Sequence, residues 1–272
     1  MLIDTHAHLN FSAYKNDVDE VIKRTLDNNI WMINVGSQYS TSKRAVELAG
    51  KYEKGVRAAV GLHPIHSQDE FVREKYKELA RSKKVVAIGE IGLDYKFAET
   101  SSHLTPHSVS PSSAKEYVPF KKRQREVFLQ QLKLAEELDL PVIFHCRMAH
   151  ADLLEVINSK FKSQNSKLNG VVHCFTGTWE QAIEYLDMGF YLGFNGIIFK
   201  LNLDEIIKKI PLDKILIETD CPYLTPPQIE GRNEPLYVKY VAEKIAQIKK
   251  LSYDKISAIT TENAIKLFKL YG

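Results

Sequence analysis

The sequence predicts an α/β fold, a single (β/α)8 TIM barrel with extra helices at its C-terminal end. Eight short apolar runs are separated by amphipathic stretches along 272 residues. Near-continuous apolar runs indicate parallel strands that are covered by helices. Eight such units suit a closed barrel, and no Gly-x-Gly-x-x-Gly turn follows the first run, as an open dinucleotide-binding sheet would usually show.

The elements follow from these patterns in chain order. The apolar runs predict strands at 1–6 (MLIDTH), 31–36 (WMINVG), 56–61 (VRAAVG), 85–90 (VVAIGE), 141–146 (PVIFHC), 170–175 (GVVHCF), 190–195 (FYLGFN) and 214–219 (KILIET). The amphipathic stretches predict helices at 18–29, 43–52, 69–81, 122–139, 151–160, 179–188 and 203–209. A final helical block begins near Pro235, and we expect one domain over 1–272.

A serine-rich segment interrupts this order after the fourth strand. Residues 97–119 are of low complexity, and they predict a long loop on the C-terminal face, where such barrels keep their active sites. A lid over the site and an idle, disordered insertion both remain open for it.

Composition narrows the class of protein without deciding its function. The formal charge is +3, from 37 basic and 34 acidic residues, which neither demands nor repels a polyanionic partner. The sequence shows no signal peptide and no apolar run of membrane-spanning length, so we expect a cytoplasmic protein, and we expect it to be a monomer. Three cysteines without a Cys-x-x-Cys spacing are expected to be reduced.

Polar residues end several of the predicted strands, where an apolar stave would otherwise continue. They are His6, His8, His63, Glu90, His145, His173 and Asp220. His6 and His8 are two residues apart, so in an extended strand they point the same way. One such histidine is more often a satisfied core residue, but a whole set converging on one rim indicates a metal site. Even four of these five imidazoles, with the two carboxylates, exceed the shell of one tetrahedral ion and suit two divalent cations bridged by a carboxylate.

Taken together, these motifs resemble the TatD family of metal-dependent deoxyribonucleases, in the amidohydrolase-like superfamily. The resemblance covers nearly the whole chain, through IDTHAHLN, GLHP, GEIGLDY, QREVFLQQLKLAEELDLPVIFHCR, HCFTG, ETDCPYLTP, GRNEP and TTENAIKLF in this order. It implies the metal ligands His6, His8, Glu90, His145, His173 and Asp220, with Glu90 bridging two ions and Asp220 as general base. Two features depart from the family pattern: Met148 stands where an acidic residue often follows, and the 97–119 insertion is longer than in most bacterial members.

The resemblance implies phosphodiester hydrolysis, in which a hydroxide held between two metal ions attacks phosphorus and Asp220 takes the proton. The family is described as Mg²⁺-dependent, whereas four imidazoles favour ions such as Zn²⁺ or Mn²⁺, so Mg²⁺, Mn²⁺ and Zn²⁺ are all candidates. The candidate contacts to phosphate or sugar are His63, Arg147, Tyr223, Arg232 and Asn233, and each could equally be structural. The sequence predicts a site at the rim of the barrel but no long groove of basic and aromatic residues. Such a site favours the ends of single-stranded DNA as substrate, and we expect a 3′-5′ exonuclease.

Two other functions stay open at this point. The same ions could support an ester or amide hydrolase, such as a D-aminoacyl-tRNA deacylase. A non-catalytic metal-binding barrel is the third alternative, because a barrel fold alone does not determine function.

Overall fold

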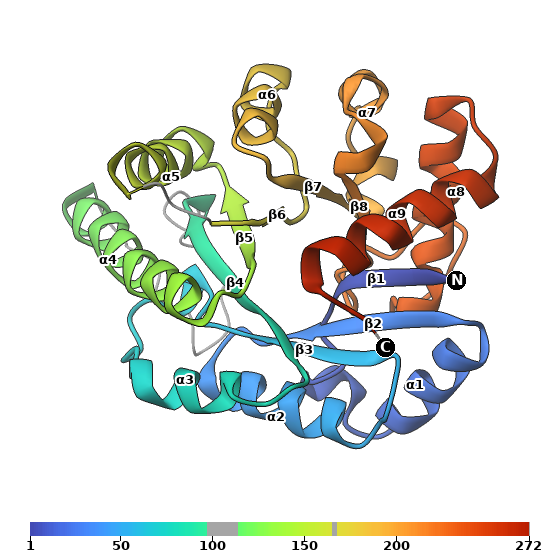
Figure 1. The fold of residues 1–272 in the computed structure, drawn as a ribbon, viewed down its shortest axis with the longest axis horizontal. Helices are drawn as coiled ribbons and strands as arrows, with labels where there is room; N and C mark the ends of the chain where they lie inside the picture. Colours follow the sequence, from blue (N-terminus) through green and yellow to red (C-terminus); the bar gives the residue numbers. More distant parts are fainter. Residues whose placement is uncertain (97–113, 165–167, 272) are drawn as a thin grey trace.

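The computed structural model describes residues 1–96, 114–164 and 168–271. Eight strands pair in parallel, each with the next along the chain, into one sheet in the order β1 to β8 (Figure 1). The strands are β1 (Leu2–Ala7), β2 (Ile30–Val35), β3 (Val56–Val60), β4 (Val85–Asp94), β5 (Val142–Arg147), β6 (Gly170–Val172), β7 (Tyr191–Phe194) and β8 (Ile215–Ile217). All eight expected strands are therefore present, and the predicted TIM barrel is confirmed.

Helices follow the strands and form the outer layer of the barrel (Figure 1). They are α1 (Val18–Asp27), α2 (Tyr39–Gly50), α3 (Arg73–Ala80), α4 (Ala114–Leu138), α5 (His150–Gln164), α6 (Trp179–Asp187), α7 (Asp204–Lys209), α8 (Val238–Lys249) and α9 (Tyr253–Phe268). No helix in the described part of the chain is both long and apolar enough to cross a membrane.

Several element boundaries differ from the prediction, and two of them lie beside the insertion. Strand β4 continues four residues beyond Glu90 to Asp94, because Ile91 and Leu93 still face the core. Helix α4 begins at Ala114, so the expectation of a loop up to residue 119 is wrong for residues 114–119. Pro119 lies early in this helix, where the proline costs about one backbone hydrogen bond. Residues 97–113, the rest of the expected loop, lie outside the described residues.

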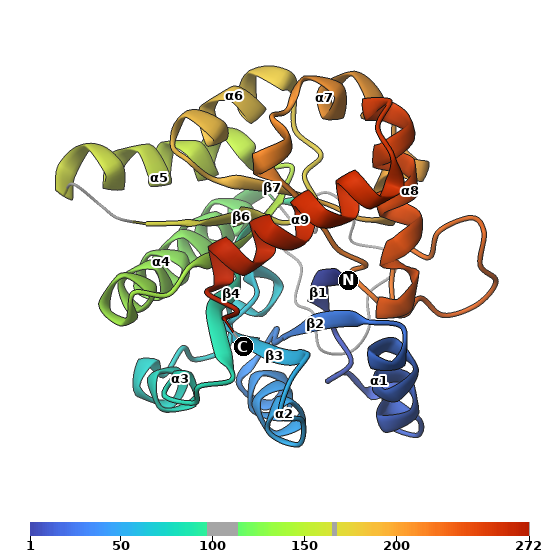
Figure 2. The same ribbon diagram turned by 45° about the vertical axis from the view of Figure 1, so that its right-hand side comes forward.

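The final helix covers the N-terminal end of the barrel. Inward-facing apolar residues from all eight strands, among them Ile3, Ile33 and Ile143, form one cluster with Ala264, Leu267 and Phe268 of α9. Two views show α9 lying across the ring of strands (Figures 1 and 2). Because α9 closes this end, side chains at the opposite, C-terminal ends of the strands remain available for a site.

The barrel closes between its last and first strands without a regular ladder. A single bridge pairs Ala7 with Cys221, and the amide of His8 donates to the carbonyl of Cys221 over 2.9 Å. The buried Asp4 carboxylate adds to this closure, since it accepts hydrogen bonds from the Thr219 amide at 2.8 Å and the Thr219 hydroxyl at 2.6 Å. The residues that complete the barrel thus lie next to His6, His8 and Asp220.

Candidate metal centre

The six residues expected as metal ligands converge at the C-terminal ends of the strands. His6 lies on β1 and His8 directly after it; Glu90 lies on β4, His145 on β5, His173 directly after β6, and Asp220 three residues after β8. The Nε2 atoms of His6 and His8 are 3.2 Å apart, as expected for alternate residues of one strand. Segments far apart in the sequence therefore meet at one point.

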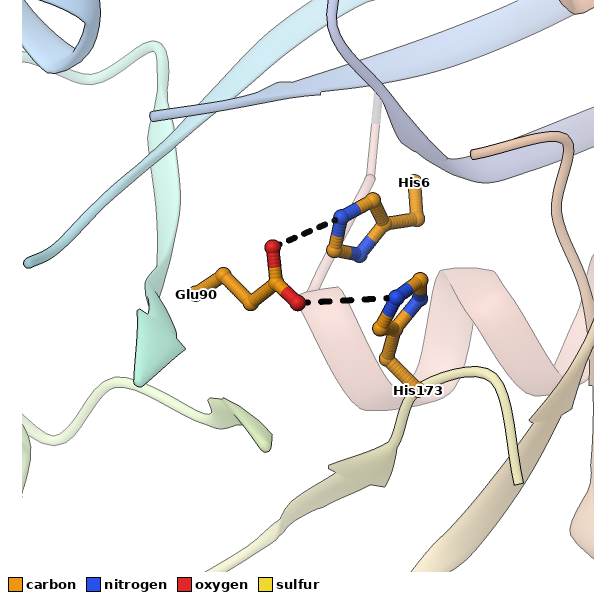
Figure 3. A group of neighbouring side chains, drawn as sticks. All are labelled: His6, Glu90 and His173. Atoms are coloured by element: carbon orange, nitrogen blue, oxygen red, sulfur yellow. Dashed lines mark ion pairs between the residues drawn. The ribbon is translucent and has the colours of Figure 1, made fainter. Parts of the chain in front are cut away.

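Glu90 lies at the centre of this cluster, and its two carboxylate oxygens face different imidazoles. Its Oε2 atom is 3.4 Å from His6 Nε2, and its Oε1 atom is 3.5 Å from His173 Nε2 (Figure 3). Oε1 also lies 2.5 Å from His145 Nδ1. One carboxylate therefore connects two groups of nitrogen donors.

Two residues take conformations that place these side chains. Gly92 has φ +148°, and a Cβ atom there would lie 2.0 Å from the carbonyl oxygen of His145. Only glycine therefore allows β4 and β5 to approach so closely beside Glu90. Asp220 has φ +57°, a left-handed conformation that is uncommon outside glycine and that recurs at functional sites.

The surrounding charges keep the two carboxylates ionised. Burial raises the pKa of Glu90, but neighbouring imidazoles outweigh burial and hold the pKa well below its usual range. Burial likewise raises the pKa of Asp220, while the contact with His8 and the nearby imidazoles lower it further than burial raises it. The cluster is thus a set of anionic oxygens and imidazole nitrogens, the donors that divalent transition metals prefer.

The chain is similar to known proteins of one family along nearly its whole length. The family model described as TatD related DNase matches residues 3–269. The chain belongs to the TatD family. A Bacillus subtilis (strain 168) protein named uncharacterized metal-dependent hydrolase YabD is 40% identical over 99% of this chain and 100% of its own length. A Cronobacter sakazakii protein named 3′-5′ ssDNA/RNA exonuclease TatD is 33% identical over 98% of this chain and 97% of its own.

Solved structures show the same likeness. The crystal structure of YJJV, a TatD homologue from Escherichia coli K12, has a TM-score of 0.82 with this chain at 27% identity, and covers 98% of each chain. A TatD family hydrolase from Entamoeba histolytica has a TM-score of 0.81 at 25% identity, over 99% of this chain and 98% of its own. This TatD-family protein is therefore a metal-dependent hydrolase.

The spacing of the donor atoms fits divalent ions. Ligand atoms about 2.1 Å from an ion lie roughly 3.4 Å from one another in a tetrahedron. The His8 Nε2 to Asp220 Oδ1 distance is 3.4 Å, and the distances from Glu90 to His6 and to His173 are 3.4 and 3.5 Å. Within the described ranges, three sets of side chains could each hold an ion: His6 with Glu90 and His173, His6 with His8 and Asp220, and His63 with Glu90 and His145.

The residues expected as substrate contacts separate into three environments. His63 belongs to the metal cluster, because its Nε2 atom lies 3.5 Å from Glu90 Oε1 and 3.1 Å from His145 Nδ1. Tyr223 is 56% exposed, with its ring edge-on to His8. Arg147 is exposed at the end of β5, and no hydrogen bond or ion pair holds its guanidinium within the described residues.

Arg232 and Asn233 instead have partners within the protein. The Arg232 guanidinium donates to both carboxylate oxygens of Asp17, over 3.1 and 2.5 Å, and lies 4.1 Å from the centre of the Tyr14 ring. The Asn233 amide donates to the carbonyls of Thr219 and Tyr223. The structure thus places the polar groups of both residues on the loop after β8, where they hold the chain beside Asp220.

Asp94 and Glu218 contact the metal cluster but were not among the predicted residues. Asp94 Oδ2 lies 2.9 Å from His145 Nε2, and Glu218 Oε1 lies 2.8 Å from His173 Nδ1. The alternation that pairs His6 with His8 could have found them, because Asp94 lies four residues after Glu90 and Glu218 two residues before Asp220. The prediction missed Asp94 because it ended the fourth strand at Glu90.

Proposed function

We propose that this TatD-family protein is a 3′-5′ exonuclease that hydrolyses phosphodiester bonds at the ends of single-stranded DNA with two divalent ions. One observation carries the proposal: the two oxygens of Glu90 face two separate groups of imidazoles. His6, His8 and Asp220 would hold one ion, and His145 and His173 the other, with Glu90 shared between them. Such an arrangement suits in-line displacement at phosphorus, where attacking and leaving oxygens both need stabilisation.

The ions, when bound, lower the pKa of water and stabilise negative charge on the phosphate. Asp220 then accepts the proton of the attacking water, since its carboxylate is ionised and its side chain remains 16% exposed. The Arg147 guanidinium, which has no hydrogen bond or ion pair to any described residue, suits a phosphate, and the exposed Tyr223 ring suits a sugar or base next to the cleaved bond.

The names of the relatives support hydrolysis in every case, but they differ in whether they state a substrate. The Cronobacter relative is named as an exonuclease on single-stranded DNA and RNA, whereas the more similar Bacillus relative is named as a metal-dependent hydrolase without a substrate. The same residues could attack a carbonyl carbon, so a D-aminoacyl-tRNA is the competing substrate.

The test is a cleavage assay on purified protein, stripped of metal and reloaded with Mg²⁺, Mn²⁺ or Zn²⁺. We expect shortening of a 5′-labelled single strand from its 3′ end, and loss of this activity in Asp220→Asn. Glu47→Gln is the matched control, because its side chain is 62% exposed and pairs with Lys43 on α2. Cleavage that continues with a blocked 3′ end would exclude the exonuclease. Hydrolysis of aminoacyl-tRNA without any DNA cleavage would favour the deacylase.

The number of ions is tested separately. We expect two divalent ions per chain by elemental analysis and by titration of the stripped protein with Zn²⁺. Glu90→Gln should weaken binding of both ions, by more than the roughly 10- to 100-fold seen when outer-shell partners are removed. A single ion per wild-type chain would contradict the two-ion site.

A further inference from the structure

Asp94 is a buried carboxylate outside the six ligands, and it contacts the far side of one of them. It is 1% exposed at the end of β4, and its Oδ2 atom lies 2.9 Å from His145 Nε2. The other nitrogen of the same ring, Nδ1, faces Glu90 Oε1 at 2.5 Å. His145 is therefore held between an outer carboxylate and the central one.

A neutral imidazole carries one proton, and the partner of each nitrogen decides where it stays. A carboxylate accepts a hydrogen bond, so Asp94 keeps the proton on Nε2 and leaves the Nδ1 lone pair free. We propose that Asp94 is a positioning residue, which fixes the tautomer and ring direction of His145 so that Nδ1 binds the ion shared with Glu90. This inference rests on the proposed two-ion site.

Asp94 is itself held firmly, as this role requires. Its second oxygen, Oδ1, accepts a hydrogen bond from the Lys96 amide over 3.0 Å. The Gln124 side chain, 1% exposed on α4, accepts from the Asp94 amide and donates to the Asp94 carbonyl, each over 3.0 Å. A chain of contacts thus runs from Gln124 through Asp94 and His145 to Glu90.

The other ligand histidines have outer partners of other kinds. The Glu218 carboxylate is 2.8 Å from His173 Nδ1, but that nitrogen has no aligned hydrogen bond, and Glu218 Oε2 has no partner among the described residues. His8 Nδ1 lies 2.8 Å from the carbonyl of Val35, and His6 Nδ1 is buried without a hydrogen bond to any described residue. Within the described residues, the Asp94 contact is therefore an aligned carboxylate hydrogen bond to a ligand histidine, on the ion that His145 and His173 would share.

The two isosteric amide variants distinguish this role from a general loss of charge. In Asp94→Asn the carbonyl oxygen can keep the Lys96 bond only if the NH₂ group faces His145 Nε2, which moves the ring proton to Nδ1. Rotating the amide restores His145 but loses the Lys96 bond. In Glu218→Gln the carbonyl oxygen can still accept from the Cys174 amide and the Asn195 side chain, as Oε1 does at 2.8 and 3.1 Å.

The experiment measures binding of Zn²⁺ to the stripped protein by competition with a chelator, independently of nuclease activity. For Asp94→Asn we expect one of the two ions to bind about 10- to 100-fold more weakly, and for Glu218→Gln a clearly smaller loss. A His145→Ala background supplies the control, because Asp94→Asn should cost no further affinity there if it acts through His145. In wild-type protein loaded with Zn²⁺, ¹⁵N NMR of labelled histidine should show His145 protonated at Nε2.

The outcomes distinguish the positioning role of Asp94 from the two-ion site itself. Wild-type affinity for both ions in Asp94→Asn, or an equal loss with and without His145, would overturn the positioning role and leave the two-ion site intact. A wild-type chain that binds no second ion would overturn both. Urea unfolding of the stripped variants shows whether a loss of binding comes from misfolding instead, and in that case Asp94→Ser, which keeps an acceptor for the Lys96 amide, should still show the His145-dependent loss.

Discussion

The backbone amide of Asp220 donates a hydrogen bond to the carbonyl oxygen of His6 over 2.8 Å. This bond joins a residue beyond β8 to the first strand, at the point where the barrel lacks a regular ladder. Both residues belong to the metal cluster, so residues that close the barrel also form part of the site. The contact between Asp4 and Thr219 belongs to the same junction, since Thr219 directly precedes Asp220 and Asp4 lies two residues before His6.

Thr219→Val should therefore weaken the fold at this junction. The substitution removes the hydroxyl that donates to the Asp4 carboxylate over 2.6 Å, and it leaves a fully buried oxygen with one partner fewer. We expect the free energy of unfolding to fall by about 1–3 kcal/mol, measured by urea denaturation of the stripped protein. Thr219→Ser keeps the hydroxyl and is the control. A free energy of unfolding in Thr219→Val equal to that of the wild type would show that this hydrogen bond does not stabilise the fold.

Arg147→Ala should impair substrate binding without affecting stability. The guanidinium is exposed and forms no hydrogen bond or ion pair within the described ranges, so we expect little change in the free energy of unfolding. Loss of one charge-assisted contact, about 1.5 kcal/mol, corresponds to roughly a tenfold rise in KM for single-stranded DNA. The salt dependence of binding should also fall, by a slope of about 0.7. Arg147→Lys should retain most of that slope; an unchanged KM in Arg147→Ala would exclude the contact.

Arg232→Ala should show the opposite behaviour. Its two bonds to Asp17 and its position over the Tyr14 ring hold the loop before α8, and its side chain is 29% exposed. We expect the free energy of unfolding to fall by about 1 kcal/mol, with KM close to that of the wild type. In an Asp17→Asn background the same substitution should cost less. A large rise in KM at unchanged stability would restore Arg232 as a substrate contact.

We expect the protein to lose stability in weak acid because His150 is buried. Burial lowers the pKa of its imidazole from 6.5 to about 4, and Nδ1 lies 3.1 Å from the Tyr185 hydroxyl. Since the unfolded chain binds the proton more tightly, this contribution is complete above pH 6.5 and is lost as the pH falls toward 4. At pH 5 the loss is about 2 kcal/mol.

His150→Gln removes this titration and keeps a group that can bond to Tyr185. Urea unfolding of both proteins at a series of pH values between 7 and 5 gives the comparison. The difference in stability, variant minus wild type, should rise as the pH falls. A difference that does not change with pH would mean that the pKa of His150 is the same in the folded and the unfolded state.

Much of the fold follows from local patterns in the sequence. The eight strands are largely apolar runs separated by amphipathic stretches, a pattern typical of a parallel sheet that is buried under helices. Helix α4 was the main error at an element boundary, since the serine-rich stretch before it hides a start at Ala114. Nothing in the local pattern distinguishes the last residues of such a stretch from the first turn of a helix.

The ligand positions follow from the sequence for a related reason. In a parallel barrel every strand ends at the same rim, so His6, Glu90 and His173 must approach one another once the strands are assigned. Histidine and glutamate are also unusual residue types at the end of an apolar strand. The sequence by itself therefore determined the class of fold and the convergence of the six donors.

Only the tertiary structure decided what each polar residue contacts. Arg147 and Arg232 both follow a predicted strand end in the sequence, so the sequence gives them the same expected role. In the structure, Asp17, more than two hundred residues away from Arg232 in the chain, lies 2.5 Å from its guanidinium and gives it a structural partner. Asp94 reaches His145 because β4 continues past Glu90 and packs against β5. Hydrogen bonds and ion pairs depend on distances of a few ångströms between segments far apart in the chain, and these distances are set by packing, which no local pattern encodes.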